Sequence, residues 1–368
     1  MAEHTKLITI DPNGDTLLKL KDIRWELPEW IDEATHFAPP AEITESSHED
    51  TAAEGAEESD QRKHPEEVHF LVSSRQLRLV STYFDNIFKK NFAESVADPA
   101  DGRYHIWATE WNPTALEQLL IVAHARNTGV NENVSFDVVV DMALIVDYYD
   151  MHETPYTHAK RLFTRWWGNG TYRSLMPESV LHGKVIRWMF LSKVYKDNHI
   201  SRRTIEIAKK HSKGPLQDLG LPLGNIPEKL EKHRQQAIKA IVDQLDSLIE
   251  RLRRGEECCS FTCRSSVLGS LILLKQSGGL STVGGGTISP PYYGTSLQEA
   301  CAAMGAMVTR KQSSVMGGRI ILDQGYMPVG ACKECDFSGL FDRIMKKVDD
   351  DLKFQLDLSP SRPVKSSD

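Results

Sequence analysis

Hydrophobic residues form short runs separated by turn-forming residues at the start of the chain. Leucine and isoleucine recur in residues 6–10 and 16–20, and Asp-Pro-Asn-Gly at residues 11–14 separates the two runs. Proline presets one turn dihedral, and glycine accepts the positive φ that closes a tight turn. The pattern therefore predicts a β-hairpin over Lys6–Leu20, and Val68–Val72 is expected to add a third strand.

A long polar stretch interrupts this predicted sheet. Residues 42–60 carry no Lys or Arg, and their acidic residues are Glu42, Glu45, Glu49, Asp50, Glu54, Glu57, Glu58 and Asp60. A segment with high charge and few bulky residues cannot bury enough apolar surface to fold, so Ala41–Lys63 is predicted to be disordered. The large side chains before it are expected to add a strand or to pack on the sheet, and they are Trp25, Leu27, Trp30 and Phe37.

Helical spacing replaces this pattern after residue 72. Apolar residues recur every three or four positions, which predicts one amphipathic helix with a stripe of Leu77, Val80, Phe84 and Ile87. Ser73 is expected to cap this helix, with Gln76 completing a capping box. A short strand is expected next, at Tyr104–Trp107.

Three further helices are predicted before residue 168. Their first residues are Asn112-Pro113, Ser135 and Thr154-Pro155, which are residue types that favour a helix N-terminus. The side chains expected to face the core are Leu116, Leu119, Leu120, Val122, Val139, Ala143, Val146, Tyr149, Tyr156, Ala159, Phe163, Trp166 and Trp167. Gly168-Asn169-Gly170 is expected to end the last helix.

The order of these elements predicts an α+β fold, because early strands and later helices do not alternate. The first predicted domain, residues 1–168, combines a small sheet with a helical cluster. The second, residues 169–368, is expected to be mostly helical, with a frayed tail from Ser359. Its predicted helices are Val180–Lys196, Ser201–His211 and Glu228–Arg254. Gly255 is expected to end the last one, and the apolar stripe of that helix is expected to pack within this domain.

Charge and cysteine content narrow the function classes. The net charge is −7, and the eight acidic residues of 42–60 account for all of it, so the remainder lacks the basic surface that nucleic acids require. No secretory signal or membrane-spanning apolar run is visible. Six cysteines without a signal indicate a reducing compartment. We therefore expect a cytoplasmic or nuclear protein that uses no cofactor and binds neither nucleic acid nor membrane.

Several motifs resemble the BTB/POZ family. Leu71-Val72-Ser73-Ser74, followed by Leu77, Leu79, Ser81 and Phe84 and then by Asn91-Phe92 and Glu94, resembles its strand-to-helix core. Ala143–Tyr149, which reads ALIVDYY, resembles a helix signature A-x-x-x-D-x-Y. The chain resembles in particular the fungal BTB-domain proteins, which continue into a helical region. The counterparts of that region are Trp188-Met189-Phe190, Gly220-Leu221-Pro222, the helix from Glu228, Cys259–Cys263 and Leu268-Gly269.

The resemblance implies an α+β BTB/POZ-like domain that acts as a non-catalytic interaction module or scaffold. Many BTB proteins form homodimers, and some bridge a cullin-type ubiquitin ligase to its substrate. The chain departs from the family where Ser73-Ser74 replaces a His and a basic residue found in many animal members. It also departs in the acidic interruption within its early sheet. Some BTB domains exchange an extra N-terminal helix and strand between protomers, and no such strand is expected before the predicted hairpin, so a dimer formed by that exchange lacks support.

Cullin adaptors of this family often carry an apolar-x-Glu tripeptide between the second and third predicted helices. The matching tripeptide here is Val130-Asn131-Glu132. The resemblance therefore implies that Val130 is a small apolar anchor and that Glu132 orients a partner through a charged hydrogen bond. The plainer interpretation is a polar connector with Gly129 at its turn.

A zinc-stabilised nuclear regulatory protein is the alternative function. Cys332 and Cys335 have the C-x-x-C spacing of one tetrahedral ion, and Cys259 and Cys263 would meet on one helix face at i and i+4. The same cysteines also fit a core segment and ordinary loop thiols.

No catalytic site is predicted. Gly284-Gly285-Gly286 lacks the Lys-Ser/Thr that follows in a phosphate-binding loop, and no G-x-S-x-G elbow is present. The pair Trp166-Trp167 fits a recognition hot spot, but helix packing is the favoured interpretation.

Limited proteolysis tests the predicted disorder. Cleavage is expected first within Ala41–Lys63, with the flanking strands remaining associated, because exposed unfolded chain is the best protease substrate. Mass spectrometry of the earliest fragments measures the cut sites. Resistance of this segment in otherwise native protein would contradict the prediction.

Overall fold

The computed structural model describes residues 5–27, 65–90, 92–168, 183–277, 280, 288–306 and 346. The chain divides into two units, and each is described by itself. The described residues up to 168, with residues 190–196, form the first unit; residues 183–189 and the described residues from 197 onward form the second. The predictions that lie outside the described residues concern Ala41–Lys63, Trp30, Phe37, Asn91, Asn169-Gly170, Gly284–Gly286, Cys332, Cys335 and the tail from Ser359.

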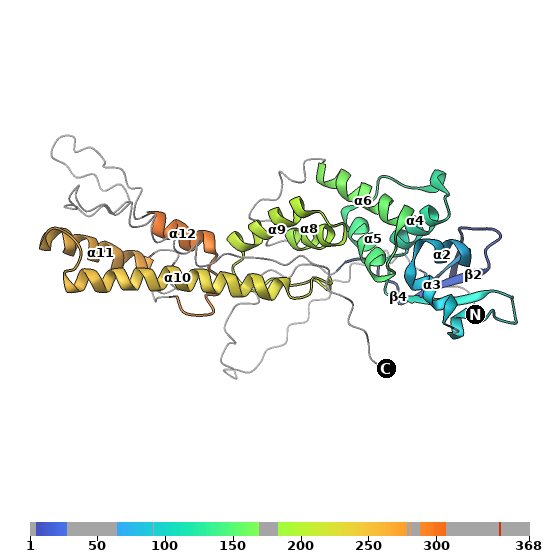
Figure 1. Ribbon diagram of the computed structural model, residues 1–368, viewed down its shortest axis with the longest axis horizontal. Coiled ribbons are helices and arrows are strands. Elements are labelled where there is room, and N and C mark those ends of the chain that lie inside the picture. The colour runs from blue at the N-terminus through green and yellow to red at the C-terminus, as the bar shows by residue number, and fades with distance from the viewer. Residues whose placement is uncertain are drawn as a thin grey trace, which may run out of the picture. The chain divides into compact units, whose positions relative to one another are not determined.

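The predicted α+β class is confirmed, because the described residues form a small mixed sheet and many helices (Figure 1). In chain order the first unit contains β1 (Thr5–Thr9), β2 (Thr16–Lys21), β3 (Glu67–Val72), α2 (Ser74–Val80), α3 (Thr82–Lys89), the 3-10 turn η1 (Ala93–Ser95), β4 (Tyr104–Thr109), α4 (Pro113–Ala123), the 3-10 turn η2 (Asn127–Gly129), α5 (Phe136–Tyr148) and α6 (Glu153–Gly168). α8 (Lys184–Val194) belongs to the first unit from Phe190 onward.

The strand order in the sheet is β1-β3-β2-β4. β3 runs parallel to β1 and antiparallel to β2, and β4 runs parallel to β2. The predicted Lys6–Leu20 hairpin is therefore wrong, because β3 lies between its two expected strands. The true hairpin is β2–β3, joined through the long interruption. β1 is the first of the two strands expected in the predicted hairpin, and it pairs with β3 instead of β2. The residues before Thr5, where no further strand is expected, lie outside the described part of the chain.

The segment between β1 and β2 forms a tight turn, in which the N–H of Gly14 donates to the carbonyl oxygen of Asp11 at 3.0 Å, but this turn carries the chain across the end of β3. The main-chain N–H groups of Ile10 and Asp11 both donate to the carbonyl oxygen of Leu71, at 3.0 Å each. A Cβ atom at Gly14 would lie 2.6 Å from the carbonyl oxygen of Val72. Glycine is required there for close main-chain approach, and not for the positive φ that the sequence analysis expected.

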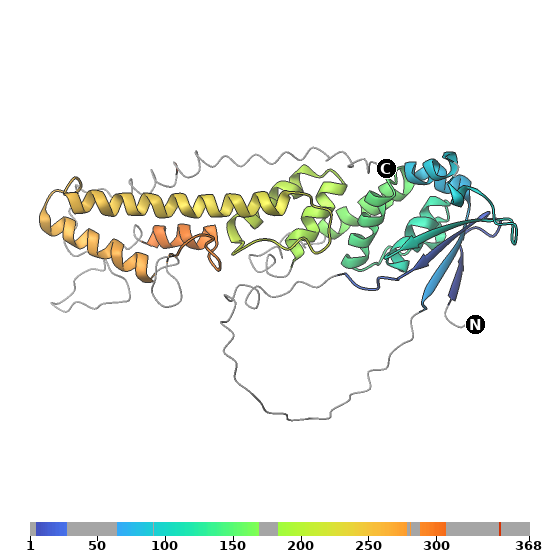
Figure 2. The same ribbon diagram turned by 90° about the horizontal axis from the view of Figure 1, so that it is seen from below.

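One face of the sheet forms the core of the first unit. Leu18, Leu20 and Phe70 are fully buried on that face, and α2 to α6 gather on the same side of the sheet (Figure 2). The opposite face carries polar and exposed side chains such as Lys19 and Trp107. This alternation follows from the two-residue period of a strand.

The residues after β2 pack on the unit and do not extend the sheet. Leu27 is buried, and the carbonyl oxygen of Trp25 accepts a hydrogen bond from Asn112 Nδ2 at 3.2 Å. Arg24 pairs with the carboxylate of Asp141 at 2.6 Å, and Asp141 is almost fully buried within α5. A buried carboxylate requires such a partner, so this pair fixes the residues directly after β2 against α5.

The predicted single helix after residue 73 is two helices. Ser81 adopts an extended conformation between α2 and α3, where it bridges to Met151. Its hydroxyl donates to the carbonyl oxygen of Tyr149 and accepts from the N–H of Phe84, so it caps α3. Because the helix breaks at Ser81, the predicted stripe is not continuous. Leu77, Val80 and Phe84 are nevertheless buried as predicted, and Ile87 is half-buried.

The predicted capping box at α2 is wrong, because the Ser73 side chain makes no capping hydrogen bond. Asp15, directly before β2, caps this helix instead: its two carboxylate oxygens accept from the N–H and the hydroxyl of Ser74, each at 2.6 Å. Burial raises the pKa of Asp15, but the hydrogen bonds from Ser74 outweigh burial and hold it below its ordinary value.

The predicted starts of α4 and α5 are confirmed. Asn112 Oδ1 accepts from the N–H groups of Thr114 and Ala115, and Ser135 Oγ accepts from the N–H of Val138. Nearly all predicted core residues of α4 to α6 are buried; Tyr156, Trp166 and Trp167 are only half-buried. α6 begins one residue earlier than predicted, at Glu153.

The second unit is helical in its described residues. Its further elements are α9 (Asn198–His211), α10 (Ile226–Arg254), α11 (Phe261–Ser277) and α12 (Leu297–Ala306). Helices α9, α11 and α12 pack along α10 (Figure 1), and the apolar stripe of α10 packs within the unit as predicted. Gly255 ends α10 with φ +81°, which confirms the predicted glycine stop. No described helix combines the length and the apolar character that crossing a membrane demands.

A buried arginine fastens residues 288–296 to α10. Arg234 is fully buried, and its guanidinium pairs with the carboxylate of Glu231 at 2.7 and 2.8 Å. The same guanidinium donates to the carbonyl oxygens of Pro291, Tyr292 and Thr295, each at 2.8 Å. All five donors of the group are occupied, which is the condition for burying its charge.

Replacing Phe84 with alanine tests the core of the first unit. Phe84 is fully buried and stacks on Tyr149 at 4.8 Å between ring centroids. Phe84→Ala is expected to lower the free energy of unfolding by about 3–5 kcal/mol, because it leaves a cavity. Urea denaturation measures the loss, with Leu79→Ala, at a position 65% exposed, as the control. Equal losses for the two variants would contradict the packing described here.

Candidate partner-binding surfaces

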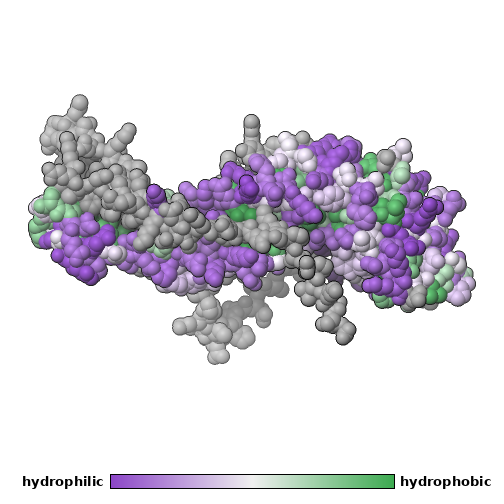
Figure 3. Space-filling model, in the orientation of Figure 1, coloured by the Kyte–Doolittle hydropathy of each residue, from purple (hydrophilic) through white to green (hydrophobic). Residues whose placement is uncertain are grey.

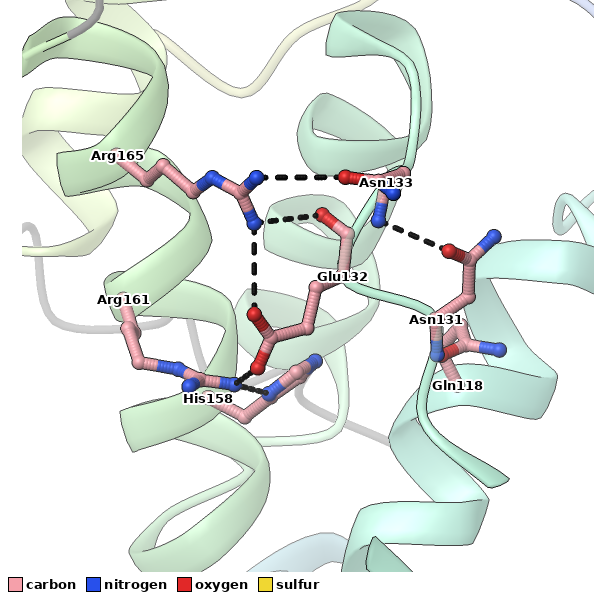
Figure 4. Close-up of polar contacts among 7 residues, drawn as sticks. All are labelled: Gln118, Asn131, Glu132, Asn133, His158, Arg161 and Arg165. Carbon is pink, nitrogen blue, oxygen red and sulfur yellow. Dashed lines mark hydrogen bonds and ion pairs between the residues drawn. The ribbon is translucent and has the colours of Figure 1, made fainter. Parts of the chain in front are cut away.

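The loop that carries Val130 and Glu132 is held to neighbouring helices by its main chain. The N–H of Asn131 donates to Oε1 of Gln118, a buried residue of α4, at 2.8 Å (Figure 4). The N–H of Asn133 then donates to Oδ1 of Asn131 at 2.9 Å. These bonds, with the cap at the start of α5, fix the path of the loop without using the Glu132 side chain.

The carboxylate of Glu132 points toward α6 (Figure 4). Oε1 lies 2.8 Å from Nη2 of Arg161, and Oε2 lies 3.4 Å from Nη1 of Arg165. Arg165 also donates to the Glu132 carbonyl oxygen and to Oδ1 of Asn133, both at 3.3 Å. The predicted pair Val130 and Glu132 thus shares one loop, but the acid is already engaged within the protein, and Val130 is half-buried.

His158 lies one turn before Arg161 on α6, and its Nδ1 is 3.3 Å from Arg161 Nη2. Burial lowers the pKa of His158, and the charge of Arg161 lowers it further, while Glu132 opposes the shift. The imidazole is therefore neutral at neutral pH and is able to accept a hydrogen bond from the guanidinium. The cluster of Glu132, Arg161 and Arg165 carries one net positive charge.

A second surface, the aromatic surface, consists of Tyr83, Phe84, Trp111, Tyr148 and Tyr149. The ring centroids of Tyr83 and Tyr148 are 5.7 Å apart, and those of Tyr148 and Trp111 are 5.2 Å apart. Phe84 and Tyr149 are buried beneath them, whereas Tyr83 is 37% and Tyr148 is 58% exposed. Figure 3 shows green patches on the mostly purple surface of this unit, but its hydropathy scale ranks tyrosine and tryptophan as slightly hydrophilic, so the green patches do not mark the aromatic surface.

The aromatic surface is uncharged. Burial raises the pKa of Tyr149, and burial together with Tyr148 and Glu94 raises the pKa of Tyr83. Both phenols therefore keep their protons at neutral pH. Trp111 Nε1 donates to the Tyr149 hydroxyl at 2.9 Å, which anchors the half-buried indole. Neutral, anchored rings with polar tips suit partner binding and offer no nucleophile.

Both surfaces contain residues that the sequence analysis missed. Arg161 and Arg165 are four residues apart on α6, which places them on one helix face. The aromatic doublets Tyr83-Phe84 and Tyr148-Tyr149 are the sequence feature that indicates the aromatic surface. Adjacent helix residues point about 100° apart, so a buried ring leaves its neighbour near the surface.

The expectation that Cys259 and Cys263 meet on one helix face is wrong, whereas the zinc site itself stays a prediction because Cys332 and Cys335 lie outside the described residues. Ser260 Oγ accepts from the N–H of Cys263, and α11 begins only at Phe261, so Cys259 precedes the helix. Cys259 is exposed and Cys263 is buried, so the two do not share a helix face. Within the parts of the chain that the structure describes, no three His, Cys, Asp or Glu side chains converge as metal ligands would.

Comparison with known proteins assigns no family to the chain. No protein-family model matches the chain, and no curated protein matches its sequence. The contacts, exposure and charge of the residues themselves therefore decide which function each surface supports.

Proposed function

We propose that this chain is a non-catalytic protein-recognition module of BTB/POZ type and that its first unit binds the partner. The aromatic surface is the observation that carries the proposal. Tyr83, Trp111 and Tyr148 come from three separate segments and rest on the buried rings of Phe84 and Tyr149. Aromatic side chains fixed by the core lose little entropy on binding and are typical hot spots of interfaces.

The arrangement of the sheet supports the resemblance to BTB/POZ domains. Compact members join the early strands by a turn, and here β2 and β3 pair as antiparallel neighbours across the interruption. The motif L-x-L-x-S-x-x-F also has a physical basis in this chain. Leu77 and Phe84 fill the core, and Ser81 ends one helix and caps the next.

The proposed partner is a cullin-type scaffold, which would make the chain a substrate adaptor. The contact is assigned to the aromatic surface and not to the Val130-Asn131-Glu132 loop, because the Glu132 carboxylate is engaged by α6. The two surfaces are separable, since they lie at opposite ends of α5. A helix of this length spans about 20 Å.

Binding of a purified cullin scaffold subunit to the full chain tests the proposal. The unmutated protein is expected to bind at micromolar concentration, measured by biolayer interferometry. Tyr83→Ala with Tyr148→Ala is expected to weaken binding by at least about thirtyfold, because the loss of even one hot-spot ring costs ~2 kcal/mol or more. Tyr148→Ala alone, at the more exposed ring, is expected to weaken binding while preserving the melting temperature.

Two control variants distinguish a contact through the aromatic surface from a contact elsewhere on the protein. Tyr293→Ala removes a tyrosine that is 50% exposed in the second unit, and it is expected to leave binding unchanged. Val130→Ala with Glu132→Ala is likewise expected to bind normally. Loss of binding in this loop variant alone would assign the contact to the loop and refute the aromatic surface. Absence of any cullin binding by the unmutated protein at micromolar concentration would refute the adaptor role.

A further inference from the structure

Arg161 and Arg165 form an exposed cationic pair on α6. Their side chains are 58% and 45% exposed, and the Glu132 side chain between them is 52% exposed. Two guanidinium groups therefore face one carboxylate at a surface that a ligand can reach. His158, the neighbouring side chain on the same helix, is neutral and leaves the net charge of the cluster unchanged.

The carboxylate of Glu132 does not make a close contact with both guanidinium groups. Its Oε1 reaches Arg161 at 2.8 Å, but its Oε2 stays 3.4 Å from Arg165. Arg165 directs its second terminal nitrogen to the neutral Oδ1 of Asn133, at 3.3 Å. A phosphoryl group carries about −1.5 to −2 charge and three acceptor oxygens, so it satisfies two guanidinium groups better than a carboxylate does.

We propose that Arg161 and Arg165 bind the phosphoryl group of a phosphorylated protein segment and that Glu132 occupies this site in the free protein. The site is able to open without unfolding, because the loop main chain is held by Gln118 and Asn131 and not by the Glu132 side chain. Glu132 then competes with the ligand for the two guanidinium groups. A partner that offers only a single carboxylate therefore does not displace Glu132. This site stands independently of cullin binding, which is assigned to the other end of α5.

Fluorescence anisotropy on the full chain tests the site with a labelled peptide, Gly-Ala-phosphoserine-Ala-Gly. Glu132→Gln is expected to tighten binding of this peptide by about threefold to tenfold, because it removes a competitor held by two exposed ion pairs. Arg161→Gln with Arg165→Gln is expected to abolish binding. The gain in Glu132→Gln keeps the test decisive if the double variant folds poorly, since misfolding does not create affinity.

Glu250→Gln is the matched control. Glu250 is also 52% exposed and pairs with a single arginine, Arg253, at 3.0 Å, so this variant makes the same change in net charge. Its affinity for the peptide is expected to stay within about twofold of the unmutated protein, as is usual for an isolated surface pair.

Four results would overturn the proposal. Equal gains for Glu132→Gln and Glu250→Gln would show a general charge effect. Equal binding of the unphosphorylated peptide would remove the phosphoryl group from recognition. Tighter binding of inorganic phosphate than of the peptide would assign the site to the free ion. No binding to any variant at millimolar peptide would show that the arginine pair only anchors the loop.

Discussion

The pairing of β2 with β3 is the constraint on which the first unit depends. It sets the face on which Leu18 and Phe70 are buried, and it places the end of β3 beside Asp15. Asp15 then caps α2 through Ser74, so a residue before β2 decides where the first helix begins. The addition of β1 to the other edge of β3 brings the chain close enough to Val72 to require Gly14.

This framework explains why the aromatic surface forms where it does. Ser81 ends α2 and restarts the helix, which turns Phe84 into the core and leaves Tyr83 at the surface. The end of α5 repeats the arrangement with Tyr149 inside and Tyr148 outside. The outer rings are therefore positioned by side chains that the fold needs for stability, and the aromatic surface inherits the rigidity of the core.

Sequence reasoning succeeded where the determinants are local. The caps at Asn112 and Ser135, the glycine stop of α10 and the buried stripes of α4 and α5 all depend on residues within one or two turns. It failed where the partner is distant along the chain. The strand order depends on a pairing across the interruption, and the helix cap depends on an acid 59 residues before Ser74. The bond from Arg165 to Glu132 spans 33 residues and was invisible for the same reason.

The separation of the two surfaces follows from the burial of α5. Its residues from Val139 to Val146 are buried, so only its two ends reach solvent-exposed neighbours. The charged cluster at one end uses long, hydrated side chains whose ion pairs are individually weak. The aromatic surface at the other end uses rings fixed by the core. The proposed partner at the aromatic end would thus leave the charged end open, where the ion pairs of Glu132 are the weak, exposed contacts that the proposed phosphoryl group would replace.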